Sequence, residues 1–135
     1  MTAEPSLDRV PTTVSMFRFS AVTWNAHRVH YDLEYATTVE GHKGLLAQAY
    51  LLSSYLCQML TAWGGPTSRI TSISYRTRSP VHAGTPVHCW ARQIEVTDGD
   101  GYHDFDFEIG LTADGGEAVT GTAQVRRPTA DALVP

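Results

Sequence analysis

The sequence predicts one α+β domain in which a curved antiparallel sheet wraps around a single long helix. Residues 44–63 carry no charged side chain and repeat apolar residues at helical spacing. After them, apolar residues recur at every second position in four segments separated by turn residues. A length of 135 residues suits one compact domain.

The chain before this helix is less regular. Residues 1–12 are polar and contain two prolines, which favours a flexible N-terminal lead. The spacing of Val14, Met16 and Phe19 predicts a first strand over 14–20. The main domain is therefore expected to begin near residue 13.

An irregular segment, 21–41, leads to the long helix and is rich in histidine and aromatic residues. Asp32 is a candidate N-cap for a short helix over 33–38. The long helix is expected to end at Gly64-Gly65-Pro66. Its apolar stripe comprises Leu45, Leu46, Ala49, Leu52, Leu56, Met59 and Leu60.

Four strands are expected after the helix, and 80–84 is expected to be a turn or bulge. Asp98–Gly101 and Asp114–Gly116 carry strong hairpin signals. The tail, 128–135, is expected to be loose. The strands are expected over 69–77, 86–96, 102–112 and 118–126.

A helix that is apolar on most sides must be covered on most sides. A curved sheet wrapped around it does this, and the arrangement is known as the hot-dog fold, expected here over residues 13–127. A single sheet layer leaves edge strands, so pairing with a second copy, a homodimer, is expected.

Composition narrows the class of protein. A formal net charge of -4 with scattered basic residues argues against nucleic-acid binding. The polar residues within 44–63 fit a buried helix better than a membrane span. Cys57 and Cys89 match no zinc or redox spacing, which favours reduced thiols in a cytoplasmic protein. His82, His88 and His103 match no metal motif, so no metal is expected.

Asn25, His27 and His30 lie within six residues, between the expected strand and the long helix. Histidine exchanges protons near neutral pH, so this cluster favours a catalytic site. The alternative is that these side chains only satisfy buried backbone groups. No GxSxG elbow and no glycine-rich phosphate loop occur, which disfavours a serine nucleophile and a nucleotide cofactor.

Residues 17–32, FRFSAVTWNAHRVHYD, resemble the signature FRFSALTFNxHRIHYD. That signature marks MaoC-like hot-dog dehydratases of the branch that includes fungal hydroxyacyl-thioester dehydratases and mesaconyl-CoA hydratases. The resemblance covers most of residues 16–87. It continues through Tyr35-Ala36 and Gly41–Leu45, which are similar to YA…GYPGL, and through Ser74–Arg76 and Pro80–Gly84, which are similar to FRAxxPLxxGD.

The resemblance implies a water-adding or water-removing reaction on a 2-enoyl or 3-hydroxyacyl thioester, with no cofactor. The wider family uses an aspartate and a histidine, which fall on Asn25 and His30. Asparagine does not exchange protons, so His30 is expected to be the general acid/base and Asn25 to orient water or thioester. Trp24, His27 and Arg28 would support substrate binding. Arg28 would hold the loop or a phosphate, or would simply be solvated or ion-paired.

The resemblance also implies an oxyanion donor at the start of the long helix, where the family reads GLVVHGP. Here His-Gly-Pro is replaced by Gln48-Ala49-Tyr50. The Ala49 N–H still supplies a donor, while Tyr50 reshapes the pocket. Gln48 either donates to a substrate carbonyl or packs against a neighbouring subunit.

Three hypotheses follow. The first is a hydro-lyase, a dehydratase or enoyl hydratase acting on a substrate carried by CoA or acyl carrier protein. The second is a specialised biosynthetic enzyme that dehydrates, isomerises or cyclises a tethered polyketide or amino-acyl intermediate. The third is a non-catalytic hot-dog subunit. Thioesterase activity is disfavoured because residues 44–63 contain no carboxylate.

Overall fold

Five antiparallel strands and one long helix make up most of the computed structural model, which describes residues 3–130. The strands lie in the order β1-β3-β4-β5-β2, so β1 and β2 form the two edges of the sheet. Along the chain, the elements are β1 (Ser6–Arg9), α1 (Thr13–Thr23), η1 (Arg28–His30), η2 (Tyr35–Val39), α2 (Ala49–Gly64), β2 (Arg69–Thr77), β3 (Val87–Gly99), β4 (Tyr102–Ala113) and β5 (Gly116–Pro128).

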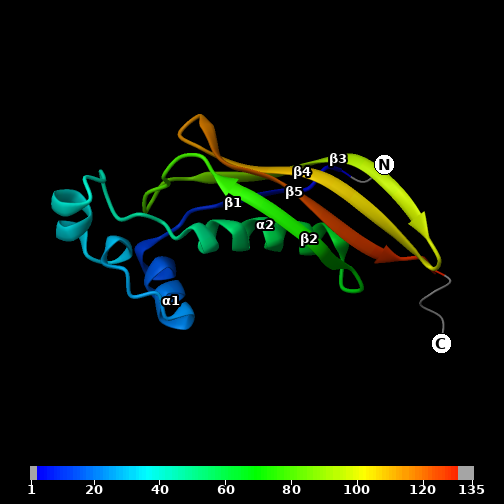
Figure 1. Cartoon of the computed structure of the whole chain (residues 1–135), viewed down its shortest axis with the longest axis horizontal. Coiled ribbons are helices and arrows are strands. Elements are labelled where there is room, and N and C mark those ends of the chain that lie inside the picture. Colours follow the sequence, from blue (N-terminus) through cyan, green and yellow to red (C-terminus); the bar gives the residue numbers. More distant parts are fainter. Residues whose placement is uncertain (1–2, 131–135) are drawn as a thin grey trace.

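The sheet arches over α2, which lies along its concave face (Figure 1). The helix and the sheet bury a shared apolar core. A fully buried leucine or phenylalanine contributes about 1.5–3 kcal/mol relative to an exposed one. The predicted hot-dog fold is thus confirmed. The largest core side chains include Leu56, Met59 and Leu60 on α2 and Phe107, Ile109 and Leu111 on β4.

Helix α2 begins at Ala49, five residues later than the start predicted at Gly44. The chain before it is extended because it pairs with other segments. Leu46 N–H donates to the Val29 carbonyl at 3.0 Å, and Ala47 N–H donates to the Val81 carbonyl at 2.8 Å. These backbone bonds replace the ones that an additional helical turn would make.

Helix α1 occupies residues for which the apolar spacing predicted a strand over 14–20, so that prediction was wrong. Thr12 caps the helix, and its Oγ1 accepts a hydrogen bond from Ser15 N–H at 3.1 Å. Met16 and Ser20, four residues apart, are its buried positions. Over so short a stretch the apolar spacing is compatible with both a strand and a helix. The Thr12 cap favours the helix.

Strand β1 lies within the lead 1–12, which the sequence suggested to be flexible. It pairs antiparallel with β3, with Ser6 opposite Trp90 and Arg9 opposite Val87. Most of its side chains are exposed, and Leu7 is only half-buried. An edge strand with so little burial leaves no alternation in the sequence.

The remaining strands match the sequence prediction closely. β2 has the predicted bounds. β3 begins one residue later and ends three residues later than predicted, β4 ends one residue later, and β5 is two residues longer at each end. Both predicted hairpin turns are present, with Gly101 at φ 77° and Gly115 at φ 75°. Of the tail predicted to be loose, residues 131–135 lie outside the described part of the chain.

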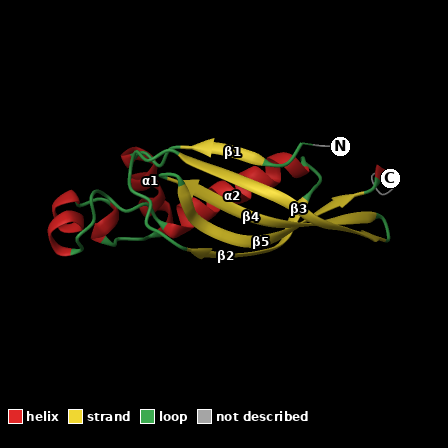
Figure 2. Cartoon of the chain, turned by 90° about the horizontal axis from the view of Figure 1, so that it is seen from above, coloured by secondary structure: helices red, strands yellow, loops and turns green. Residues whose placement is uncertain are grey.

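Asp32 acts as the predicted cap, since its Oδ1 accepts from Tyr35 N–H at 3.0 Å. The helical turn that follows is a π-helix, η2. Together with α1 and η1 it forms an overhang at one end of the sheet, beyond the start of α2 (Figures 1 and 2).

In the described part of the chain, no helix is long and apolar enough to cross a membrane.

Candidate active site

A cavity of about 480 Å³ opens where the overhang meets the start of α2 and the end of β2. The overhang contributes Asn25 and His30, the approach to α2 contributes 46–50, and the segment leaving β2 contributes 77–81. Five of the eight predicted site residues therefore line one cavity. They are Asn25, His30, Gln48, Ala49 and Tyr50.

His30 ends the turn η1, which is anchored by the buried side chain of Val29. The Nδ1 atom of His30 donates to the Leu46 carbonyl oxygen at 2.6 Å. Because a carbonyl only accepts, Nδ1 carries the proton and Nε2 keeps a free lone pair. Burial lowers the pKa of His30, partly offset by this hydrogen bond. The lowered pKa favours the neutral imidazole near pH 7.

The carbonyl that fixes His30 is itself held by backbone pairing. Leu46 forms an antiparallel bridge with His82, and Ala83 N–H donates to the Leu45 carbonyl at 2.8 Å. The predicted turn at 80–84 therefore serves as a short strand-like support. Leu46 N–H is bonded to Val29, and the neighbouring residues Leu45 and Ala47 are bonded to Ala83 and Val81, so the backbone that carries the acceptor of His30 is held in place.

Asn25 is placed by two hydrogen bonds. Its N–H donates to the Ser20 carbonyl at 3.0 Å, and its Oδ1 accepts from His27 N–H at 3.2 Å. An acceptor at Oδ1 assigns the amide nitrogen to the other position. Among the described residues, Nδ2 makes no hydrogen bond, and Asn25 lines the cavity.

The start of α2 presents backbone donors to the same cavity. Ala49 and Tyr50 are the first two helical residues, and the Gln48 side chain makes no capping bond to them. The N–H groups of a first helical turn have no intrahelical acceptor and carry a positive partial charge. This end of α2 is suited to an oxygen that gains negative charge.

Gln48 is only 1% exposed, and its side-chain amide is bonded within the chain. Its Nε2 donates to the Met16 carbonyl and to Ser20 Oγ, both at 2.8 Å. Both amide protons are therefore used inside this chain. The expectation that Gln48 donates to a substrate carbonyl or packs on a neighbouring subunit is replaced by a link between α1 and α2.

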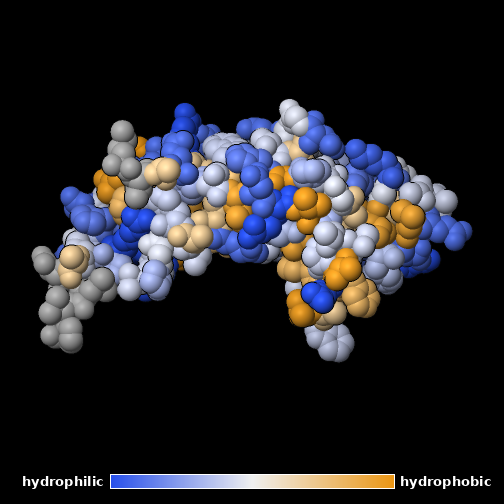
Figure 3. All heavy atoms as spheres, turned by 180° about the vertical axis from the view of Figure 1, so that it is seen from behind, coloured by the Kyte–Doolittle hydropathy of each residue, from blue (hydrophilic) through white to orange (hydrophobic). Residues whose placement is uncertain are grey.

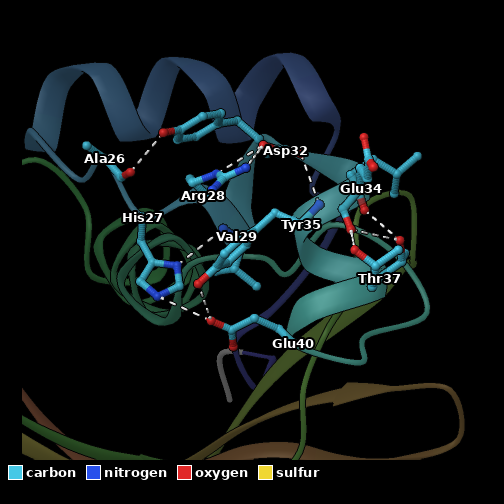
Figure 4. A network of polar contacts seen from close by, with 12 residues as sticks. Ala26, His27, Arg28, Val29, Asp32, Glu34, Tyr35, Thr37 and Glu40 are labelled. Atoms are coloured by element: carbon cyan, nitrogen blue, oxygen red, sulfur yellow. Dashed lines mark hydrogen bonds and ion pairs between the residues drawn. The ribbon is translucent and has the colours of Figure 1, made fainter.

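His27 and Arg28 lie outside the cavity, in a polar network of the overhang (Figure 4). The His27 Nδ1 accepts from Val29 N–H at 3.2 Å, and its Nε2 lies 3.6 Å from Glu40. Arg28 donates through Nε and Nη2 to Asp32 at 3.1 and 2.9 Å and lies over the Tyr35 ring. Both side chains support the loop.

Trp24 was expected to support substrate binding, but it does not line this cavity and is 94% exposed. It ends α1 in the left-handed conformation, at φ 54°. With Phe17 and Tyr31 it lines a shallow depression of about 370 Å³, which Asn25 also borders. Figure 3 shows apolar side chains gathered at this end of the molecule.

The cavity wall formed by 77–81 was missed as part of the site. The similarity of this stretch to a family motif was the available signal, but the motif alone did not indicate which residues face a ligand. Backbone bonds hold the wall in place, because Arg78 N–H donates to the Ala118 carbonyl at 2.7 Å.

Residues 2–83 match the family model described as hydroxyacyl-thioester dehydratase type 2. The chain belongs to this family. One relative is the mesaconyl-C(4)-CoA hydratase of Chloroflexus aurantiacus. It is 39% identical over 84 residues, which cover 62% of this chain and 29% of that protein. The mitochondrial hydroxyacyl-thioester dehydratase type 2 of Schizosaccharomyces pombe is 30% identical over 78 residues, with coverages of 57% and 26%.

The chain thus spans less than a third of the length of each of these two relatives. Among solved structures, the (R)-hydratase from A. caviae aligns with a TM-score of 0.84 over 93% of this chain and 95% of that one. The identity is 20%, so this likeness speaks for the fold. Within residues 3–130, no group of three or more potential metal ligands is found.

Proposed function

We propose that this chain is the catalytic hot-dog unit of a hydro-lyase that interconverts 2-enoyl and 3-hydroxyacyl thioesters. The main support is the neutral His30, whose Nδ1 is committed to Leu46 while the side chain lines a cavity with Asn25 and Ala49. Membership of the dehydratase family and the names of its two relatives agree with this chemistry.

In the hydration direction, His30 Nε2 takes a proton from water while the water oxygen bonds to Cβ of the enoyl thioester. The Cα–Cβ π electrons move toward the carbonyl and form an enolate. The protonated Nε2 then returns the proton to Cα, which completes the addition of one water. Dehydration is the reverse and begins with removal of the Cα proton by neutral His30. One general acid/base group serves both directions.

The enolate oxygen needs preorganised donors. The N–H groups of Ala49 and Tyr50, at the uncapped start of α2, supply them. Loss of one such donor in other enzymes costs about 10²–10³-fold in rate. Ala49 is exposed and lines the cavity, which is consistent with an accessible N–H group there.

Asn25 completes the site by donating from Nδ2 to the water oxygen or the thioester. It has no exchangeable proton near neutral pH, so its proposed role is orientation. The hydrogen bond from His27 N–H to Oδ1 keeps the amide in the required rotamer.

The decisive experiment compares hydration of crotonyl-CoA by the wild type and by His30→Ala. The reaction is measured as the loss of absorbance of the enoyl thioester. General acid/base groups contribute about 10²–10⁴-fold, so kcat is expected to fall by about 10³-fold. An unchanged melting temperature would show that the variant is folded. Full activity in His30→Ala would overturn the proposal.

We also propose that the protein acts as a homodimer. The overhang exposes large apolar side chains, including Phe17 at 66%, Val22 at 76% and Trp24 at 94%. Apolar surface gathered at one end of a chain is typical of an interaction site. The mass in solution tests this: an active dimer is expected, and an inactive monomer would instead favour one half of a heteromeric enzyme.

A specialised biosynthetic enzyme is the second candidate. The observation in its favour is Tyr50, which lines the cavity and stays 70% exposed at its mouth. Its phenol would select a substrate larger or more polar than a simple enoyl chain. Turnover of crotonyl-CoA at ordinary enzyme rates, with kcat above about 1 s⁻¹, would remove this candidate.

A cytoplasmic location is proposed with either activity, on the evidence of the two cysteines. Cys57 and Cys89 are both free thiols. Burial raises the pKa of Cys89 to about 12, so this thiol is unreactive. Reduced, inert cysteines are typical of proteins in a reducing compartment.

A further inference from the structure

One wall of the cavity, residues 77–81, carries a positive charge. Among the described residues that line it, Arg78 is the one with a permanent charge, and no aspartate or glutamate joins it. The chain as a whole has a formal net charge of -4. A positive cavity in a negative protein attracts an anionic ligand against the overall field.

Arg78 is oriented but not neutralised. Its Nε donates to Thr120 Oγ1 at 2.9 Å, and its backbone N–H is held by Ala118. Within the described part of the chain, no carboxylate lies in ion-pair distance of its guanidinium. Several other arginines are instead paired with an acid: Arg28 with Asp32, Arg92 with Glu108 and Arg126 with Asp104.

A guanidinium has five N–H donors in a rigid fork, and Thr120 uses one of them. The four donors on the two Nη atoms match the two oxygens of a carboxylate or phosphate. Because Nε is already anchored, binding such a group costs little additional side-chain entropy. The neighbouring hydroxyl residues Thr77 and Ser79 line the same wall.

We propose that Arg78 is the anion-recognition residue of this cavity and binds an oxyanion of the acyl-thioester substrate. The oxyanion is either a phosphate of the carrier arm or a carboxylate on the acyl group. The proposal rests on the proposed function only for the identity of the substrate. Arg28, which the sequence suggested as a phosphate ligand, is excluded from this role by its pairing with Asp32 outside the cavity.

The experiment measures dissociation constants by titration calorimetry for two probes that are not turned over. Coenzyme A carries phosphates but no acyl carboxylate, and succinyl-pantetheine carries a carboxylate but no phosphate. The proteins are the wild type, Arg78→Gln and the matched control Arg76→Gln. Arg76 is exposed, belongs to the same strand end and does not line the cavity.

Arg78→Gln is expected to bind at least one probe about 10-fold or more weakly, as expected for a lost charge-assisted pair. Weaker binding of coenzyme A identifies a phosphate, and weaker binding of succinyl-pantetheine identifies a carboxylate. Arg76→Gln is expected to stay within about twofold of the wild type, because exposed charges are screened by salt. Arg78→Lys is expected to recover part of the affinity, since it keeps the charge without the fork.

Equal affinities of Arg78→Gln and the wild type for both probes would overturn the proposal, as would a wild type that binds neither probe. Equal losses in Arg78→Gln and Arg76→Gln would also overturn it, since they would indicate a general charge effect. His30→Ala is expected to bind both probes normally. Failure of the proposed catalysis and failure of this binding role are therefore distinguishable, and thermal melts of each variant confirm folding.

Discussion

His27 and His30 lie three residues apart in one turn, yet the structure gives them opposite environments. His27 is exposed, and its two ring nitrogens face Val29 N–H and Glu40 within the overhang. His30 is half-buried, lines the cavity and is bonded to Leu46, sixteen residues away. One histidine holds its own loop, while the other is held by a different part of the fold.

The difference shows how a base acquires a defined protonation state. A local cap such as His27 moves with the segment that it caps. His30 is tied to Leu46, and Leu46 is tied to Val29 and to the His82 bridge. A ring fixed by paired backbone keeps one tautomer and one direction through the reaction, which is what proton transfer requires.

After the loss at His30, the largest effect is expected at Asn25, the other polar side chain of the proposed site. In Asn25→Ala the Nδ2 donor is lost, and kcat for hydration is expected to fall by about 10–100-fold, the equivalent of about 1–3 kcal/mol for one hydrogen bond. Steady-state kinetics provide the measurement. Asn25→Asp keeps an acceptor for His27 N–H and is the control for folding of the turn. Activity of Asn25→Ala within twofold of the wild type would remove Asn25 from the site.

A second test concerns the support of Asn25. Gln48 donates to Ser20 Oγ, and the Ser20 carbonyl accepts from Asn25 N–H. In Gln48→Leu two buried acceptors lose their donor, so the free energy of unfolding is expected to fall by about 2–3 kcal/mol. Urea denaturation measures this loss. Gln58→Leu, on the exposed side of the same helix, is expected to lose less than about 1 kcal/mol, and equal losses in both variants would contradict the assigned role.

The pH dependence of the reaction sharpens the comparison of the two histidines. Burial lowers the pKa of His30, and the neutral imidazole is the active form in both directions. The acid limb of kcat/KM is therefore expected below pH 6.5. At pH 6.0 an ordinary histidine would be about one quarter neutral, so the rate is expected to exceed about one quarter of its plateau. A half-point at or above pH 6.5 would argue against His30 as the base.

Strands β2 to β5 and α2 were predictable because each repeats apolar residues at its own period over nine or more residues. β2 and both hairpin turns follow from alternation and glycine placement alone. β1 and α1 were not predictable in this way. β1 buries too little to show alternation, and the register of α1 depends on Thr12 and on a bond from Gln48, which lies 32 residues from Met16.

The site was predictable as a segment but not as a set of contacts. The motif brought Asn25 and His30 to attention, and both line the cavity. It assigned Trp24 and Arg28 to substrate binding and could not show that they lie outside the cavity, because this depends on the exposure of Trp24 and on the pairing of Arg28 with Asp32. The wall containing Arg78 lies about fifty residues further on, and only the folded chain brings it into the same cavity as His30.

The smallest effect is expected at His27, and it completes the comparison with His30. In His27→Asn the side-chain oxygen replaces Nδ1 as the acceptor for Val29 N–H, since asparagine is a favourable cap. The exposed contact with Glu40 contributes at most about 1 kcal/mol. Hydration of crotonyl-CoA is therefore expected to stay within about threefold of the wild type, with an unchanged acid limb. A loss approaching that of His30→Ala would mean that proton transfer runs through both rings, and the distinction between the holding and the held histidine would fail.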